Sequence, residues 1–167
     1  TNGYGPANID INTPFTVRLS LSYFKLESTL NTLNTRYIYE LTLPAGVSVA
    51  GTGNPKWING YFPSTSAQIA TTYTQVGNVI RITSPSNLFG YALIDLVYDC
   101  STGSGISVVN LPYKVLEIND ITTNCAINSD LSCGSISLSA YCPGACATGP
   151  ITGIPVIRRA ENSLGWT

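Results

Sequence analysis

The sequence predicts an all-β protein built as an antiparallel β-sandwich. Several stretches alternate apolar and polar side chains with the period of two that is typical of half-buried strands. Gly, Pro and Asn separate these stretches, and no stretch has convincing helical periodicity. Roughly seven to ten short strands with turn signals between them favour a sandwich, and a closed barrel is the alternative.

The first half of the chain opens with the clearest strand, over 15–23, where apolar residues alternate with Thr, Arg and Ser. A second strand is predicted over 37–43, and Pro44-Ala45-Gly46 ends it as a turn. Residues 47–49 resume as an edge strand. The stretch 51–66 is rich in Gly, Asn and Pro, so we predict a long loop with aromatic anchors there.

The second half continues the pattern. Strands are predicted over 67–76 and 79–83, joined by Gly77-Asn78, a dipeptide suited to the positive φ angles of tight hairpin turns. Residues 91–99 are apolar on both faces, as expected of a central strand between packed layers. The remaining predicted strands are a long one over 106–118 that Pro112 interrupts, one over 135–140 and one over 154–159.

This pattern predicts a division into three parts. Residues 1–120 form the β-sandwich domain, and 121–150 form a Cys-rich strand and loop extension of the same domain. Residues 151–167 form a linker and the start of a following module. The absence of Met is expected of a mature or excised piece of a longer protein.

The composition excludes several classes of partner. Hydrophobic residues make up 44% of the 167 and charged residues only 10%, against roughly a quarter in an ordinary domain. With a net charge of -1 and eight scattered Lys and Arg residues, the chain lacks the basic cluster that nucleic acid requires. No apolar run approaches the roughly 20 residues that span a bilayer, so no membrane insertion is expected.

The sequence also predicts that the protein is not an enzyme. It contains no His, which excludes imidazole bases and His-ligated zinc, and it has no phosphate-binding loop. Asp95 and Asp99 are the nearest pair of acids that a glycosidase would need. Four positions apart on one strand, their Cα atoms would be about 13 Å apart, so we expect them to be structural or solvated.

All five cysteines lie in the second half of the chain, which predicts disulfides and an oxidising, extracellular setting. The short Cys-Pro-Gly-Ala-Cys spacing also resembles half of a zinc site, but the sequence has no matching second half. Pairing of Cys125 with Cys133 and of Cys142 with Cys146 is one of several connectivities. The disulfide candidates are Cys100, Cys125, Cys133, Cys142 and Cys146.

Two further patterns carry candidate binding residues. Asn8, Asp10 and Asn12 place oxygen ligands on alternate residues, as a Ca²⁺ site would, although an exposed edge strand has the same pattern. Apart from this Ca²⁺ no cofactor is expected. The aromatic side chains in the predicted loop have two interpretations, stacking on sugar rings or pinning the loop to its own core. They are Trp57, Tyr61 and Phe62.

One segment resembles a known family. The run Tyr39-Glu40-Leu41-Thr42-Leu43-Pro44-Ala45-Gly46-Val47 resembles the strand and turn of the conserved-repeat domains of large bacterial surface proteins, which are immunoglobulin-like sandwiches strung in series. The segments 96–100 and 156–167 are similar to the joint between units in giant secreted surface proteins of the Bacteroidota. The resemblance implies that this chain is an immunoglobulin-like sandwich with a Cys-rich C-terminal extension. It also implies type IX secretion and a role in adhesion, gliding motility or surface-layer structure, with no catalytic residue.

These observations together predict a structural and interaction module of a secreted, adhesin-type or filament-type cell-surface protein. Its expected partners are adjacent modules of the same polypeptide or neighbouring copies, together with surface glycans or the secretion machinery. The alternative is a carbohydrate-binding, lectin-like domain that uses the loop 51–66. A secreted hydrolase using Asp95 is the weakest of the three hypotheses.

Overall fold

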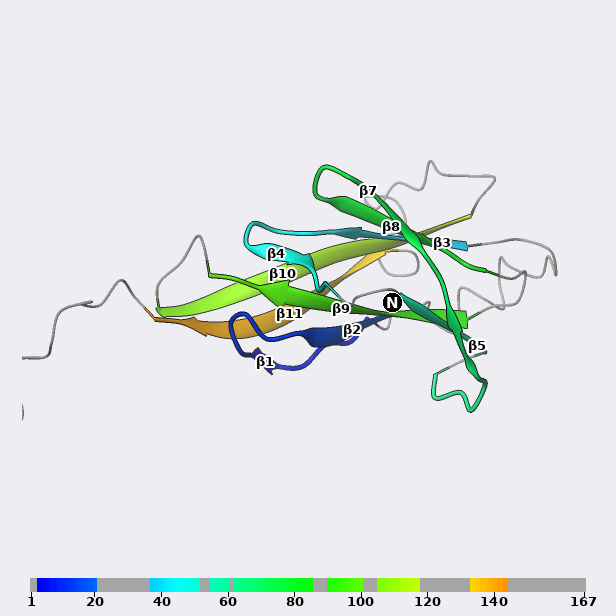
Figure 1. The fold of residues 1–167 in the computed structure, drawn as a ribbon, viewed down its shortest axis with the longest axis horizontal. Helices are drawn as coiled ribbons and strands as arrows, with labels where there is room; N and C mark the ends of the chain where they lie inside the picture. Colours follow the sequence, from blue (N-terminus) through cyan, green and yellow to red (C-terminus); the bar gives the residue numbers. More distant parts are fainter. Residues whose placement is uncertain are drawn as a thin grey trace, which may run out of the picture.

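The computed structural model describes residues 3–20, 37–51, 55–60, 62–85, 90–100, 105–117 and 133–143. In these ranges the chain forms strands without helices, and the strands build two sheets (Figure 1). None of the described segments is a helix long and apolar enough to cross a membrane. The predicted all-β sandwich of antiparallel sheets is therefore confirmed.

The larger sheet has six strands in the order β1-β11-β10-β3-β8-β7. Its neighbours pair antiparallel, except that the two-residue strand β1 pairs parallel with β11. The long strands β10 and β11 run side by side along most of the molecule (Figure 1). The bounds are β1 Asn8–Ile9, β3 Tyr37–Thr42, β7 Tyr73–Val76, β8 Val79–Thr83, β10 Gly105–Glu117 and β11 Cys133–Cys142.

The smaller sheet has five strands, in the order β2-β9-β5-β6, with β4 pairing beside β5 on the same side of β9. The strand β9 is central because it pairs with β2, β4 and β5. This confirms the prediction of a central strand over 91–99. The bounds are β2 Phe15–Leu19, β4 Val47–Val49, β5 Lys56–Asn59, β6 Gln68–Ala70 and β9 Gly90–Tyr98.

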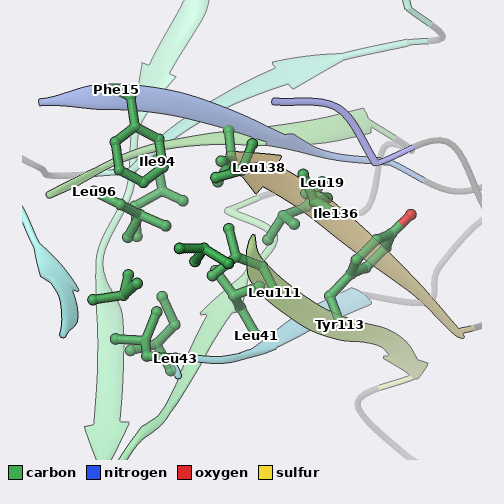
Figure 2. Packing of buried hydrophobic residues seen from close by; sticks show 14 of the residues in the cluster. Phe15, Leu19, Leu41, Leu43, Ile94, Leu96, Leu111, Tyr113, Ile136 and Leu138 are labelled. Carbon is green, nitrogen blue, oxygen red and sulfur yellow. The ribbon is translucent and has the colours of Figure 1, made fainter. Parts of the chain in front are cut away.

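The core lies between the sheets, since alternate residues of each strand point inward. In β2 the inward residues Phe15, Val17 and Leu19 are buried, whereas the outward residue Thr16 is exposed. Figure 2 shows Ile94 and Leu96 of one sheet close to Leu138, Leu111 and Leu41 of the other. The apolar residues that alternate in the sequence are therefore the residues that form this core.

Three sequence predictions are corrected by the strands. The stretch 67–76 is not one strand, because β6 belongs to the five-stranded sheet and β7 to the six-stranded sheet. Residues 51–66 are not one long loop, because β5 lies within them and pairs with both β9 and β6. Pro112 does not interrupt its strand, because β10 continues through it and pairs it with Ser135. Since β3 pairs with β10 only from Tyr113 onward, Pro112 lies where one side of β10 has no partner strand, a place that tolerates a missing N–H.

Both predicted turns are present in the structure. Gly77 and Asn78 form the two-residue connection of the β7–β8 hairpin, and Gly77 has a φ of 60°. The Pro44-Ala45-Gly46 turn closes with a hydrogen bond from the Val47 amide to the Pro44 carbonyl, and Gly46 has a φ of 81°. Glycine occupies these two positions because other residues rarely adopt positive φ. The predicted strand over 154–159 lies outside the described residues.

Candidate functional site

The core occupies the inner faces of both sheets, so binding surfaces must be sought on the outer faces. On the six-stranded sheet, three charged residues lie side by side on β8, β3 and β10. The buried Glu40 carboxylate forms ion pairs with both cations. Its Oε2 lies 2.8 Å from Arg81 Nε, and its Oε1 lies 3.3 Å from Lys114 Nζ. Both cations share one acid, so each charge in this part of the outer face has an opposite charge beside it.

The same outer face carries an apolar patch farther along β10 and β11, which we call the 106–141 patch. It consists of Ile106, Val108 and Tyr141, whose exposed fractions are 80%, 65% and 69%. Ile106 and Tyr141 are direct partners across the two strands, and Val108 follows Ile106 on the same face. The three side chains are therefore contiguous, and large apolar side chains grouped in this way mark contact surfaces.

The outer face of the five-stranded sheet carries a different cluster, around Arg18 of β2. The Arg18 guanidinium carbon lies 3.5 Å from the ring centroid of Phe62 and 5.4 Å from that of Tyr4. Phe62 in turn contacts the ring of Tyr91 edge-on, with centroids 5.6 Å apart. Two backbone hydrogen bonds between Tyr4 and Arg18 hold the N-terminal segment against β2.

The charge of Arg18 is only partly solvated. Desolvation by burial lowers the pKa of its guanidinium, while Tyr91, Tyr4 and Tyr113 act in the opposite direction. Its Nε atom is buried and has no hydrogen-bond partner in the described part of the chain. Among the described residues, Arg18 therefore contacts aromatic rings and no counter-charge, unlike Arg81 on the opposite sheet.

The three aromatic residues proposed for ligand binding separate in the structure. Trp57 has no exposed surface, because β5 directs it into the core against Tyr39, and its indole N–H donates to Asn59 at 2.9 Å. Trp57 is thus removed from the predicted ligand-binding set. Phe62 is 54% exposed, whereas Tyr61 lies outside the described residues.

The proposed Ca²⁺ ligands lie at one edge of the six-stranded sheet. Asn8 is part of β1, whereas Asp10 and Asn12 belong to the turn that follows. The Thr13 amide closes this turn onto the Asp10 carbonyl, and Asn12 has the positive φ of 56° that Asn tolerates in turns. In the described ranges, no group of three or more His, Cys, Asp or Glu residues is placed to hold a metal ion. The Ca²⁺ site stays a prediction.

The cysteines form a cross-link between the two sheets. Cys100, just after β9, is bonded to Cys142 at the end of β11. This pairing overturns the suggested Cys142–Cys146 bond and removes Cys142 from any zinc half-site. Cys133, at the start of β11, is also disulfide-bonded, whereas Cys125 and Cys146 lie outside the described residues.

The two acids considered for hydrolysis serve local structure. Asp95 accepts a hydrogen bond from the Thr16 hydroxyl of the neighbouring strand β2. The Asp99 amide donates to the Gly46 carbonyl at 3.0 Å and so fastens the Pro44-Ala45-Gly46 turn to the end of β9. The Asp95 carboxylate is therefore engaged with β2, whereas the contact of Asp99 is made by its backbone.

Sequence reasoning missed the Arg18 cluster and the 106–141 patch. Arg18 is one of the outward-facing residues of β2, so the alternation of the sequence predicts that it lies on a surface. The alternation does not predict which aromatic residues lie beside it. Ile106 and Val108 are apolar in the outward phase of β10, which was a usable signal. Apolar residues at alternate positions that are out of phase with the core indicate an exposed patch.

The fold and these surfaces define a two-sheet β-sandwich with cross-linked layers and exposed aromatic and apolar clusters. No family model matches the sequence, and no curated protein matches it. Among solved structures, the chain is similar to the major pilin subunit of Bacillus cereus, with 11% identity and a TM-score of 0.46. That match covers 81% of this chain and 36% of the pilin chain.

Two further similar structures are collagen-binding domains. The first comes from a Staphylococcus aureus adhesin, with 8% identity, a TM-score of 0.44 and coverage of 83% of this chain and 95% of that one. The second comes from a surface protein of Erysipelothrix rhusiopathiae, with 9% identity, a TM-score of 0.47 and coverage of 79% and 46%. This chain spans well under two thirds of the pilin and of the Erysipelothrix protein. At these identities and scores, no conclusion about ligand or activity follows.

Proposed function

We propose that this chain is a non-catalytic structural and interaction module of a secreted cell-surface protein of the adhesin or filament type. In this proposal it contacts a neighbouring module through the 106–141 patch. The patch is the observation that carries the proposal, because Ile106, Val108 and Tyr141 are exposed together on one face. Burying such side chains against a partner is favourable by about 25 cal/mol for each Å² of apolar surface removed from water.

The position of the patch suits end-to-side contact between modules. Ile106 and Tyr141 lie at the end of the β10–β11 pair, beside the Cys100–Cys142 disulfide. The edge strand β1 at this side is only two residues long, and short edges resist uncontrolled pairing of sheets. We therefore expect contact through side chains of the patch and not through an added strand.

Two further features support the module interpretation. The disulfide between the sheets fits an oxidising compartment outside the cytoplasm. Glu40 binds two cations and Asp95 binds Thr16, and these contacts support a structural role for both acids. The finer assignment, to a giant Bacteroidota protein with type IX secretion and gliding motility, stays part of the proposal and rests on the sequence resemblance alone.

The contact is tested by self-association of the chain, since modules in series present like surfaces to one another. Sedimentation velocity of the 167-residue chain at rising concentration, up to the millimolar range typical of tethered modules, should show reversible association. We expect the variant with Ile106→Ser and Val108→Ser to remain monomeric over the same range. Tyr141 is retained in this variant so that the end of β11 is unchanged.

A matched control is available on the same sheet. Val76 is 82% exposed on β7, at the opposite edge from β1, and is not part of the patch. Val76→Ser removes the same kind of side chain and should associate like the wild type. A wild-type chain that stays monomeric throughout, or equal loss of association in both variants, would contradict the proposed contact.

A further inference from the structure

The outer face of the five-stranded sheet carries two cations in one row. Arg18 of β2 is the register partner of Leu93 in β9, and Leu93 is the partner of Lys56 in β5. Residues in one row across two strand spacings lie about 10 Å apart at their Cα atoms. The alternation of the strands turns both side chains outward, away from the core.

Within the described residues, these cations have no counter-charge from the protein. Neither Arg18 nor Lys56 takes part in an ion pair there. Asp95 lies two residues beyond Leu93 on β9 and accepts the Thr16 hydroxyl. The two cations of the opposite sheet, by contrast, both bind Glu40.

The aromatic rings around Arg18 are themselves open to solvent. Phe62 is 54% exposed and Tyr4 is 61% exposed, although each contacts the guanidinium. Phe62 rests with its ring against Tyr91, which is buried on this outer face, so Phe62 is supported from beneath. Arg18 therefore lies between two exposed aromatic rings on the outer face of the sheet.

We propose that this face binds a carbohydrate that carries carboxylate groups, of the uronic acid type, with Arg18, Tyr4 and Phe62 as the binding residues. The guanidinium fork of Arg18 would bind the carboxylate, for which its geometry is suited. The apolar face of the sugar ring would pack on Phe62 or Tyr4. Lys56 would meet a second acidic residue farther along the same oligomer.

The arrangement favours an acidic sugar over an acidic polypeptide. Both would satisfy the unpaired cations, but an Asp or Glu side chain has no broad apolar face to cover the exposed rings. A uronic acid joins a carboxylate and a ring with an apolar face in one residue, and the Arg18 cluster presents both complementary groups side by side. The site lies on the other sheet from the 106–141 patch, so it goes beyond the module contact and does not depend on it.

The test is titration of the 167-residue chain with an oligomer of galacturonic acid, followed by isothermal titration calorimetry. We expect binding by the wild type and no binding of the fully methyl-esterified oligomer, which keeps the rings but loses the charge. Arg18→Gln should weaken binding by about tenfold or more, the effect of losing a charge-assisted hydrogen bond. Arg18→Lys should weaken it less, and Phe62→Ala should weaken it without changing the charge.

The control is Arg81→Gln, which removes one positive charge from the opposite sheet and leaves Glu40 paired with Lys114. This variant should bind like the wild type. No binding of the acidic oligomer, equal binding of its ester, or equal weakening by Arg81→Gln would overturn the proposal. Binding of polyglutamate that is as tight and is unaffected by Phe62→Ala would assign the site to an acidic polypeptide instead. Circular dichroism of each variant verifies that the sandwich is intact.

Discussion

Gly90 of β9 lies against the backbone of β5 and against the indole ring of Trp57. Its carbonyl accepts the buried hydroxyl of Tyr39 at 2.8 Å, and its α-carbon faces the Ile58 carbonyl. A methyl group added there would overlap both the Ile58 oxygen and the Trp57 ring. The absence of a side chain at residue 90 is therefore what allows Trp57 to enter the core.

Gly90→Ala should lower the free energy of unfolding by about 1–3 kcal/mol, the usual cost of forcing extra volume into a packed site. Urea denaturation followed by far-ultraviolet circular dichroism measures this change. Gly51→Ala is the matched control, because a methyl group at residue 51 meets nothing within 4 Å. Equal shifts of the two midpoints would show that the close approach at Gly90 is unimportant.

At the scale of single elements, the β7–β8 hairpin depends on its two-residue turn. Gly77 has a φ of 60°, and the turn is fastened to the end of β3 by the Leu43 amide, which donates to the Asn78 carbonyl at 2.7 Å. The Asn78 side chain returns a hydrogen bond to the Leu43 carbonyl at 3.3 Å. The turn therefore sets both the register of the hairpin and its attachment to the sheet.

Gly77→Ala should destabilise the protein by about 1–2 kcal/mol, because an L residue resists positive φ. The space around residue 77 is open, as it is around Gly51, so a clash cannot contribute. Gly51→Ala thus separates the backbone effect from any general effect of adding a methyl group. Hydrogen exchange of the β8 amides should accelerate in Gly77→Ala, whereas unchanged exchange and stability would contradict a special role of the turn.

The same scale shows what the sequence could predict. A strand with clean alternation, such as β2, was predictable because only one of its faces meets the core. The strand β5 was not predictable, because Trp57 and Ile58 are both buried although they point to opposite faces. Ile58 is covered on the outer face, where its register partner is the buried Tyr91. The alternation of apolar and polar residues cannot predict that a neighbouring side chain buries a residue on the outer face.

The sites were harder to predict than the strands for a related physical reason. Trp57 and Phe62 are five residues apart in a Gly- and Pro-rich stretch, and nothing local distinguishes the buried ring from the exposed one. Arg18 gains its aromatic neighbours from the N-terminal segment and from the residues after β5, which only the folded chain brings together. Strand phase is local information, whereas site geometry depends on contacts between distant segments.

At the scale of the whole molecule, the described residues form two layers that share a core and are joined by the Cys100–Cys142 cross-link. The Cys100–Cys142 disulfide joins the end of the central strand β9 to the end of β11, residues separated by 42 positions. Cys142 has no exposed surface and lies near the Tyr98 hydroxyl, so the cross-link is an extension of the core. Its largest effect should be on the unfolded chain, whose conformations it restricts.

The variant with Cys100→Ala and Cys142→Ala should lose about 2–4 kcal/mol of stability, the range expected for opening a loop of this length. If the unfolded chain is the state that the disulfide restricts, its removal exposes more surface on unfolding, so the urea m-value should rise as the midpoint falls. If loss of native contacts were the cause instead, the midpoint would fall at a constant m-value. Both quantities come from one urea titration of each protein, and an unchanged midpoint would show that the Cys100–Cys142 bond does not stabilise the fold.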